Sequence, residues 1–402
     1  MHKIERLLQT LAPKGVEFRK LGEVINIFKG KQLNKELLLD YGEYPVMNGG
    51  IHASGYWNEY NTDYPKIIIS QGGASAGYVN YMTSKFWAGA HCYVIELNSE
   101  KLNYKFLYYF LKNSQIILMK SQFGAGIPAL NKADIETLTI PIPPLEVQQE
   151  IVKILDAFTE LNTELNTELN ARKKQYEYYQ NMLLDFNGIH SNHKDAKMSA
   201  KTYPKRLKTL LQTLAPKGVE FRKLGEVCDF QKGKSITKKA VTFGKVPVIS
   251  GGRQPAYYHN EANRSGETIA ISSSGVYAGY VSYWDIPVFL ADSFSVSPKQ
   301  KTLMPKYLFH YLTTQQDAIH ATKSTGGIPH VYSKDLQNFL IPIPPLEVQQ
   351  EIVKILDQFA ALTTDLLAGI PAEIKARKKQ YEYYREKLLT FKPLTPNKEV
   401  KK

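Results

Sequence analysis

Apolar residues recur at spacings of three and four along two long stretches of this chain. The first stretch begins at Leu145 and continues to about Phe186. Its apolar positions are Val147, Ile151, Ile154, Leu155, Phe158, Leu161, Leu165 and Leu169. This spacing predicts one amphipathic helix, roughly 60 Å long at about 1.5 Å per residue, with a single stripe that contacts another helix.

A second stretch, 346–391, carries the same pattern and is the expected partner of the first. Gly369, Ile370 and Pro371 interrupt it, and a glycine followed so closely by proline predicts a break or a kink. We expect the two helices to pack antiparallel and to act as a spacer between two globular domains.

Two other stretches, 25–138 and 228–338, contain short runs of strand-forming residues interrupted by Gly, Asn and Pro. Examples are 66–70, 78–81, 268–272 and 279–283. Each stretch also has one helical run, at 104–119 and 305–319. The pattern predicts an α+β protein, in which two α/β-type domains are separated by two long antiparallel helices.

The two halves of the chain share long identical blocks. Residues 7–24 (LLQTLAPKGVEFRKLGEV) recur at 210–227, residues 140–156 (IPIPPLEVQQEIVKILD) at 341–357, and residues 171–179 (ARKKQYEYY) at 376–384. The sequences between these blocks diverge. This internal repeat predicts two units related by a pseudo-two-fold axis, with equal docking surfaces and different recognition surfaces.

The repeats suggest seven segments. These are a repeated element (1–24), a variable domain (25–138), a long helix (139–186), a basic linker with the second repeated element (187–227), a second variable domain (228–338), a second long helix (339–391) and a tail (392–402). Glycine-containing motifs show that the variable domains share one skeleton: 44–50, 76–81 and 123–128 align with 246–252, 278–283 and 324–329. We expect the linker, 187–206, to be flexible and the lysine-rich tail to fray.

Charge and composition narrow the class of protein. The net charge of +13 favours a polyanionic partner such as nucleic acid. Segment 25–138 is almost neutral, however, with ten lysines against nine acidic residues. Two cysteines, one in each half, make no disulfide framework, and no apolar run reaches the length of a membrane span. We therefore expect a cytoplasmic protein with no membrane contact.

Motifs for catalysis are missing or incomplete. Gly233, Lys234 and Ser235 resemble the end of a phosphate-binding loop, but Cys228 occupies the required upstream glycine position. There is no HExxH motif, and Pro144 is followed by Leu145 and Glu146 rather than by the tyrosine of an adenine methyltransferase motif. His190 and His193 lie in the linker without a third metal ligand. We expect no catalytic residue, cofactor or metal on this chain.

These features together resemble the specificity subunit of type I restriction-modification systems. The resemblance rests on the duplicated IPIPPLEVQQEI entry into a long helix, on the ARKKQYEYY block and on the two variable domains, and it covers nearly the whole chain. A threefold Thr-Glu-Leu-Asn repeat at 159–170 is similar to the spacer repeat of one subgroup. One departure is that the second long helix lacks this repeat.

The resemblance implies a non-enzymatic subunit of an adenine methyltransferase and endonuclease complex. Each variable domain would be a target recognition domain that reads one half of a bipartite, interrupted sequence in double-stranded DNA. The helices would dock two modification subunits, which carry S-adenosylmethionine, and restriction subunits would join that core. The competing hypotheses are a stand-alone DNA methyltransferase or nuclease, and a two-headed adaptor that binds only proteins.

Side chains near the glycine-rich turns are the candidates for reading bases, and nearby lysines the candidates for holding phosphates. In 25–138 they are Asn48, Gln71, Ser75, Tyr78, Gln122 and Asn131, with Lys29, Lys31, Lys120 and Lys132. In 228–338 they are Ser250, Arg253, Ser274, Tyr277, Ser324 and His330, with Lys232, Lys234, Lys323 and Lys334. For each, the alternative is a turn hydrogen bond or a solvated charge.

Tyrosines near the ends of the long helices are candidates for partner contacts. The clusters at 176–179 and 381–384 hold three tyrosines each, which cannot all face one helix. Because tyrosine is common at protein interfaces, we expect Tyr176, Tyr179, Tyr381 and Tyr384 to contact the modification subunits. Tyr280, which aligns with Tyr78, is left out because this strand position is expected to face the core.

Overall fold

The structure is a computed structural model that describes residues 2–124, 128–186, 203–299, 301–324, 327–364 and 369–394. The chain divides into two compact units. Unit 1 comprises Met1–Asn166 and Ile374–Lys402, and unit 2 comprises Thr167–Glu373. Each unit contains one variable segment, and both mix helices with mainly antiparallel sheets, so the predicted α+β class is confirmed.

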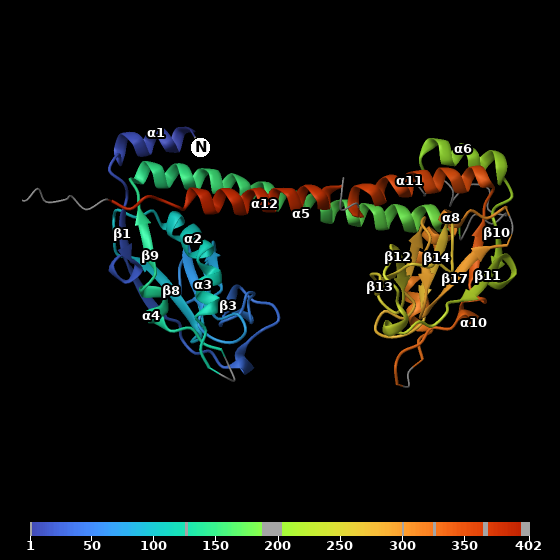
Figure 1. Ribbon diagram of the computed structural model, residues 1–402, viewed down its shortest axis with the longest axis horizontal. Coiled ribbons are helices and arrows are strands. Elements are labelled where there is room, and N and C mark those ends of the chain that lie inside the picture. Colours follow the sequence, from blue (N-terminus) through green and yellow to red (C-terminus); the bar gives the residue numbers. More distant parts are fainter. Residues whose placement is uncertain are drawn as a thin grey trace, which may run out of the picture. The chain divides into compact units, whose positions relative to one another are not determined.

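The variable part of unit 1 combines two small sheets with three helices (Figure 1). Its strands are β2 (Ile25–Lys29), β3 (Tyr44–Met47), β4 (Gly55–Trp57), β5 (Lys66–Ser70), β6 (Val79–Met82), β7 (Trp87–Ala88) and β8 (Cys92–Leu97). Its helices are α2 (Tyr104–Asn113), α3 (Gln115–Lys120) and α4 (Lys132–Glu136). The strand orders are β2-β8-β5-β6 and β4-β3-β7, and among the described residues of these sheets only β3 and β7 pair in parallel.

Unit 2 repeats this arrangement strand for strand. Its strands are β11 (Cys228–Lys232), β12 (Val246–Ile249), β13 (Tyr257–His259), β14 (Thr268–Ser272), β15 (Val281–Trp284), β16 (Phe289–Leu290) and β17 (Ser293–Pro298). Its helices are α8 (Pro305–Thr314), α9 (Gln316–Ala321) and α10 (Ser333–Leu336). The orders β11-β17-β14-β15 and β13-β12-β16 match those of unit 1, so the shared skeleton inferred from the glycine motifs is present.

The repeated blocks build the frame around each variable part. In unit 1 they form α1 (His2–Leu11), β1 (Glu17–Lys20) and β9 (Thr139–Ile142), and in unit 2 α6 (Lys205–Leu214), β10 (Glu220–Lys223), α7 (Leu224–Val227) and β18 (Leu340–Ile343). β1 pairs antiparallel with β9, and β10 with β18, in the same register. The variable segment therefore leaves and re-enters the frame through one two-stranded sheet in each unit.

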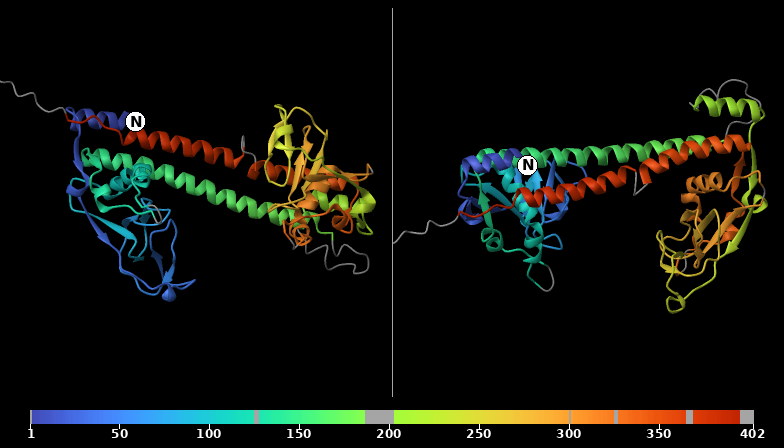
Figure 2. Two further views of the ribbon diagram at one scale, coloured as in Figure 1. Left: turned by 60° about the horizontal axis from the view of Figure 1, so that its bottom comes forward. Right: turned by 45° about the horizontal axis from the view of Figure 1, so that its top comes forward.

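The long helices follow the apolar periodicity. α5 (Leu145–Leu184) is one continuous helix of 40 residues that begins directly after Pro143 and Pro144, as predicted. In unit 1 α12 (Ile370–Leu388) lies along α5, where Phe158 stacks on Tyr384 at 5.6 Å between ring centroids (Figures 1 and 2). In unit 2 Tyr179 stacks on Phe359 of α11 (Leu346–Thr364) at 5.1 Å. The partner of Phe158 is Tyr384 and the partner of the later residue Tyr179 is the earlier residue Phe359, so the helices pack antiparallel.

The predicted interruption of the second long helix is confirmed. α11 ends at Thr364 and α12 begins at Ile370, so the helical segment is in two pieces. Pro371 lies in the first turn of α12, where a missing backbone N–H leaves no intrahelical bond unmade.

The structure changes or leaves partly undescribed three predicted segments: the short helical runs, the linker and the tail. The helical runs 104–119 and 305–319 are each two helices, broken at Ser114 and Gln315. Most of the expected flexible linker lies outside the described residues, but its end belongs to helix α6. The chain is paired as far as Leu394, since Val16 N donates to Lys392 O and Leu394 N to Val16 O, both at 3.0 Å, and the rest of the tail expected to fray lies outside the described residues.

A buried glutamine joins each variable part to its long helix. The amide of Gln148 on α5 donates to Pro143 O at 2.6 Å and to Lys101 O at 2.8 Å, and it accepts from Asn103 N at 2.7 Å. Asn103 is the N-cap of α2, so this one side chain ties α2 to the start of α5. Its burial in a site that satisfies all three bonds makes each bond costly to lose.

Unit 2 has the same junction at Gln349. Its amide donates to Pro344 O at 2.7 Å and to Thr302 O at 2.8 Å, and it accepts from Met304 N at 2.9 Å. The repeated PPLEVQQ sequence therefore encodes the junction between frame and variable part, and not only the start of a helix.

A carboxylate two turns further along each helix adds a second link. In unit 1 Asp156 accepts from Lys105 Nζ at 2.8 Å and from the Tyr109 hydroxyl. In unit 2 Asp357 lies 2.6 Å from Lys306 Nζ and 3.0 Å from His310 Nε2. Burial alone would raise the pKa of Asp357, but the hydrogen bonds from His310 and Lys306 outweigh it and lower that pKa.

Gln148→Ala should destabilise unit 1 because Asn103 N, Lys101 O and Pro143 O would all lose a buried partner. We expect the free energy of unfolding to fall by about 3 kcal/mol, the range for several buried polar groups left unsatisfied. Gln149→Ala is the matched control, since the neighbouring glutamine is exposed. Equal thermal unfolding midpoints for the two variants would contradict this account of the junction.

Candidate nucleic-acid interface

Four segments meet at one end of the sheets in unit 1. They are the turns after β3 and β5, the turn before β8 and the segment before α4, and backbone hydrogen bonds hold the last three together. Gln71 N donates to His91 O at 2.9 Å, Gly73 N to Pro128 O at 2.8 Å, and Leu130 N to Gln71 O at 2.8 Å. We call residues 48–51, 71–75, 91 and 128–131 the unit 1 turn cluster.

Unit 2 has the same three bonds at the equivalent positions. Ser273 N donates to Asp292 O at 3.0 Å, Gly275 N to Pro329 O at 3.0 Å, and Val331 N to Ser273 O at 2.9 Å. Residues 250–253, 273–277, 292 and 329–332 form the unit 2 turn cluster. The two clusters thus share a backbone framework while most of their side chains differ.

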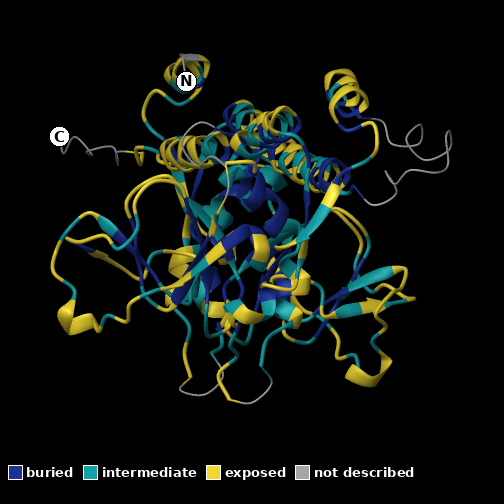
Figure 3. Ribbon diagram, turned by 90° about the vertical axis from the view of Figure 1, so that its right-hand side faces the viewer, coloured by how far each residue is buried: buried dark blue, intermediate teal, exposed yellow. Residues whose placement is uncertain are grey.

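The turn clusters are accessible. Gly73 and Gly275 have positive φ angles of 79° and 84° and no atom within 4 Å of the space a Cβ would occupy. Val276 next to Gly275 is 81% exposed. Figure 3 shows exposed turns at the ends of the buried strands. A backbone that is open and glycine-containing can approach a ligand closely.

Two predicted residues of unit 1 hold the turns in place. Asn48 Oδ1 accepts from His91 N at 3.1 Å. With its amide oriented to satisfy both neighbours, Gln71 accepts from Lys29 Nζ at 3.1 Å and donates to Ala90 O at 3.3 Å. The structure therefore brings Asn48, Gln71 and Lys29 to the same cluster, with part of their hydrogen-bonding capacity used inside the protein.

Three other unit 1 candidates are accounted for by local structure. Gln122 Nε2 donates to Ala76 O at 2.7 Å, Asn131 forms a capping box with Asp134 at the start of α4, and Lys132 lies 3.3 Å from Glu136. These bonds are the turn and surface interactions that were the alternative to DNA contact. Lys31 and Lys120 are exposed, Ser75 is half-buried, and Tyr78 lies under Lys112 with 3.9 Å between Nζ and the ring centroid.

Arg253 is the best-positioned candidate in unit 2. Its guanidinium lies 4.9 Å from the ring centroid of Tyr277 and 5.5 Å from that of Tyr280. Stacking on aromatic faces restricts an arginine while leaving its N–H groups available. Tyr280, left out of the candidates as a core residue, therefore positions Arg253. Lys323 Nζ donates to Val276 O at 3.3 Å on the same cluster.

The remaining unit 2 candidates divide into turn supports and exposed cations. Ser324 Oγ accepts from His330 N at 3.1 Å, and the Ser250 carbonyl accepts from Ser272 Oγ at 3.1 Å. Ser274 Oγ donates to the Asp292 carboxylate. The exposed cations are Lys232, Lys234 and Lys334, the last of which lies 5.4 Å from the Tyr332 ring centroid.

Sequence reasoning missed two exposed residues at equivalent points, His91 and Asp292. Each precedes the first residue of the strand that pairs with β5 or β14, Cys92 or Ser293. A signal was present, since both are charged or titratable residues in short turns with a buried strand behind them. An extra residue in unit 1, between Ala88 and Cys92, hid the equivalence.

The two clusters differ in electrostatic character. Unit 2 has Arg253 and Lys323, where unit 1 has Ile51 and Gln122. Burial lowers the pKa of His320 behind the unit 2 cluster, and the charges of Lys323 and Arg253 lower it further. The unit 2 cluster therefore has two cations that unit 1 lacks, and the Asp292 carboxylate offsets one of them.

The four tyrosines predicted to contact partners are half-buried and pack against residues of their own unit. Tyr179 stacks on Phe359, the Tyr176 hydroxyl lies 3.4 Å from His310 Nδ1, and Tyr381 and Tyr384 pack against Phe158. Instead, Tyr178 and Tyr383 are exposed, at 60% and 58%. The reason is helical phase: residues one position apart on a helix point about 100° apart, so the middle tyrosine of each cluster faces outward.

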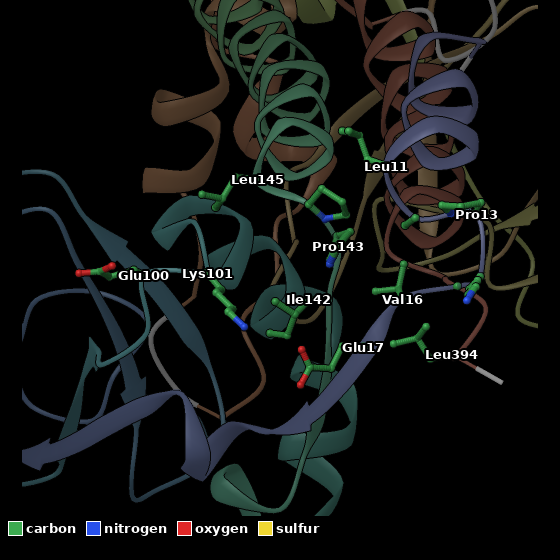
Figure 4. Close-up of a pocket in the computed structure, with 14 residues that line it drawn as sticks. Leu11, Pro13, Val16, Glu17, Glu100, Lys101, Ile142, Pro143, Leu145 and Leu394 are labelled. Atoms are coloured by element: carbon green, nitrogen blue, oxygen red, sulfur yellow. The ribbon is translucent and has the colours of Figure 1, made fainter. Parts of the chain in front are cut away.

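A pocket of about 650 Å³ in unit 1 is formed mostly by the repeated blocks, with Pro143, Val16 and Leu394 among its lining residues (Figure 4). Burial raises the pKa of the Cys92 and Cys228 thiols to about 12. In the described part of the chain no three His, Cys, Asp or Glu side chains are arranged to hold a metal, and every helix there is too short or too polar to cross a bilayer.

Comparison with known proteins identifies the class. The family model of the type I restriction modification DNA specificity domain matches twice, at residues 13–174 and 216–376. A putative type I restriction enzyme specificity subunit of Haemophilus influenzae is 34% identical over 405 residues, covering 96% of this chain and 98% of the relative. A type I restriction enzyme specificity subunit of Escherichia coli is 30% identical over 438 residues, covering 98% of both chains.

Solved structures agree with the fold. The crystal structure of a type I restriction-modification S subunit from M. genitalium has a TM-score of 0.66 and 25% identity, covering 93% of this chain and 96% of that one. A chain from a study of assembly and conformational transition of the type I system has a TM-score of 0.54 and 20% identity, covering 94% and 98%. The present chain belongs to the specificity subunits of type I restriction-modification systems, the non-catalytic subunits that recognise the DNA target within the complex.

Arg253→Ala should weaken recognition at one position of the target. If the guanidinium binds a guanine in bidentate fashion, the loss at that position is about 1–3 kcal/mol. Arg253→Lys is the matched control, because lysine keeps the charge but not the planar fork. Base preference is measured by mapping methylated sites in a target library with the reconstituted complex. Unchanged preference in both variants would show that Arg253 is only a solvated charge.

Proposed function

We propose that each turn cluster reads one half of a bipartite, interrupted sequence in double-stranded DNA. The observation that carries this proposal is the pairing of one backbone framework, held by the same three hydrogen bonds, with two different sets of side chains. A conserved framework can present side chains to a groove in the same way in both halves. Different side chains then read different bases.

Cations beside the clusters support contact with the DNA backbone. Lys29 is the last residue of β2 and Lys31 follows it, as Lys232 is the last residue of β11 and Lys234 follows it, and all four are exposed. Such lysines hold phosphates and fix the register of a protein on the duplex without reading sequence. Because Arg253 and Lys323 in the unit 2 cluster outnumber the opposing carboxylate of Asp292, we expect this half of the target to contribute the greater part of the salt-dependent affinity.

The frame is proposed to dock two modification subunits, which carry S-adenosylmethionine and to which restriction subunits are added. The identical block at 171–179 and 376–384 presents an exposed tyrosine in each unit, Tyr178 and Tyr383. Two copies of one surface bind two copies of one partner. Exposed tyrosine suits such an interface, because a rigid ring supplies contact area at little entropic cost.

The Thr-Glu-Leu-Asn repeat is proposed to set the spacing of the two half-targets. It lies within the uninterrupted helix α5, whose residues pass from unit 1 to unit 2 between Asn166 and Thr167. Leu165 is buried, and Leu161 and Leu169 are half-buried, so the repeat keeps leucine near one stripe. A change in the number of repeats would alter helix length without altering either turn cluster.

Mixing the chain with its modification subunit should give a complex of one chain and two modification subunits by native mass spectrometry. The double variant with Tyr178→Ala and Tyr383→Ala should bind at least one modification subunit fewer, whereas alanine at the packed Tyr179 should lower the stability of the fold. Saturation at one modification subunit would refute the proposed symmetry.

Methyl transfer to DNA should require the complex, and the chain alone should neither methylate nor cleave DNA.

Deletion of one repeat, residues 163–166, should shorten the unread spacer by one base pair. Four residues are about 6 Å of helix and about 40° of rotation beyond a full turn. One base pair advances roughly 3.4 Å and turns about 35°. The rotation therefore matches one pair, and tilt must absorb the excess length. Methylated-site mapping should return both half-targets unchanged. An unaltered spacer, or altered half-target bases, would show that the repeat is not the ruler.

A further inference from the structure

His91 and Asp292 occupy one structural position in the two units, although their side chains have opposite chemistry. In each unit the carbonyl of this residue accepts from the first residue of the neighbouring turn, Gln71 or Ser273. The next residue, Cys92 or Ser293, is buried in the sheet. The backbone of His91 and Asp292 is thereby fixed on both sides, while both residues are exposed at the turn cluster.

Glycines keep the surroundings of this position open. In unit 1 a Cβ on Gly49 would lie 3.2 Å from both the carbonyl oxygen and Cβ of His91. In unit 2 a Cβ on Gly251 would lie 2.5 Å from Ser274 O and 3.6 Å from Asp292 Oδ2. A side chain at Gly49 would crowd His91, and a side chain at Gly251 would clash with Ser274, the residue that holds Asp292, so both glycines keep this position open.

The carboxylate of Asp292 is unexpected on a surface that is proposed to bind the phosphates of DNA. It repels the DNA backbone, and unlike Arg253 and Lys323 it adds nothing to electrostatic affinity. One oxygen, Oδ2, accepts from Ser274 Oγ, which orients the group. An ionised carboxylate has further acceptor capacity, and the exocyclic amino group of cytosine is the donor that Asp and Glu read in the major groove.

His91 offers the complementary chemistry in unit 1. A neutral imidazole has one N–H donor and one acceptor, so it can donate to the N7 or O6 acceptors of a purine. At the same backbone position, unit 1 therefore has a donor, His91, where unit 2 has an acceptor, Asp292.

We propose that this position determines base specificity in both units: Asp292 accepts from the amino group of a cytosine in one half-target, and His91 donates to a purine acceptor in the other. The inference rests on the proposed function, since it requires that the turn clusters contact DNA. It adds one residue in each unit whose identity sets a base of the target.

The test is methylated-site mapping with the reconstituted complex on a library randomised in both half-targets. Asp292→Asn keeps the shape of the side chain and an oxygen for Ser274 but replaces one acceptor by a donor. We expect at least a tenfold loss of discrimination at one position of the unit 2 half-target, with the unit 1 half-target unchanged. His91→Gln should change one position of the unit 1 half-target in the same way.

Asp285→Asn is the matched control, because it makes the same change at an exposed carboxylate of unit 2 outside the turn cluster. It should leave the base preference unchanged. If it alters the preference as Asp292→Asn does, the loss of a negative charge is sufficient to explain both variants and the inference is wrong. If neither Asp292→Asn nor His91→Gln changes base preference while the wild-type complex remains sequence-specific, the inference fails and the proposed function stands. A wild-type complex without sequence preference would overturn the proposed function itself.

Discussion

A single buried amide in each unit fixes the relation between the variable part and the conserved helix. Gln148 and Gln349 each make three hydrogen bonds, and every partner is a main-chain atom. The junction is therefore independent of the side chains at Lys101, Thr302 and their neighbours. Both turn clusters depend on it, because α2 and α8 stand directly behind the sheets that end in those turns.

In the turn clusters, too, main-chain atoms hold the structure while side chains are free to differ. Main-chain hydrogen bonds set the positions of the turns, and side chains that take no part in those bonds supply the chemistry. Arg253, which stacks on two tyrosines in unit 2, and the uncharged Ile51 in unit 1 occupy the same place on one framework. Recognition can thus differ between the halves while the scaffold stays constant.

Sequence periodicity and repetition predicted the long helices, the break before Pro371 and the α+β units, because these depend on local spacing and on blocks that are identical in both halves. The site was less predictable. Gln122 and Asn131 are used by local hydrogen bonds that depend on the folded turn. Tyr178 and Tyr383 point outward because of helical phase. The sequence did not predict this, because few apolar residues near the helix end show which face is buried. His91 and Asp292 became equivalent only when strand register revealed an extra residue in one turn.

The division into units also sets an order of assembly during synthesis. Unit 2 is one continuous stretch, Thr167–Glu373, whereas unit 1 needs Ile374–Lys402 in addition to the first 166 residues. Domains tend to fold as units while the chain emerges from the ribosome. The side of α5 that carries Phe158 therefore remains uncovered until Tyr384 and its neighbours have been synthesised. The amino-terminal unit is begun first and completed last, so a ribosome that stops early would leave unit 1 as the incomplete one.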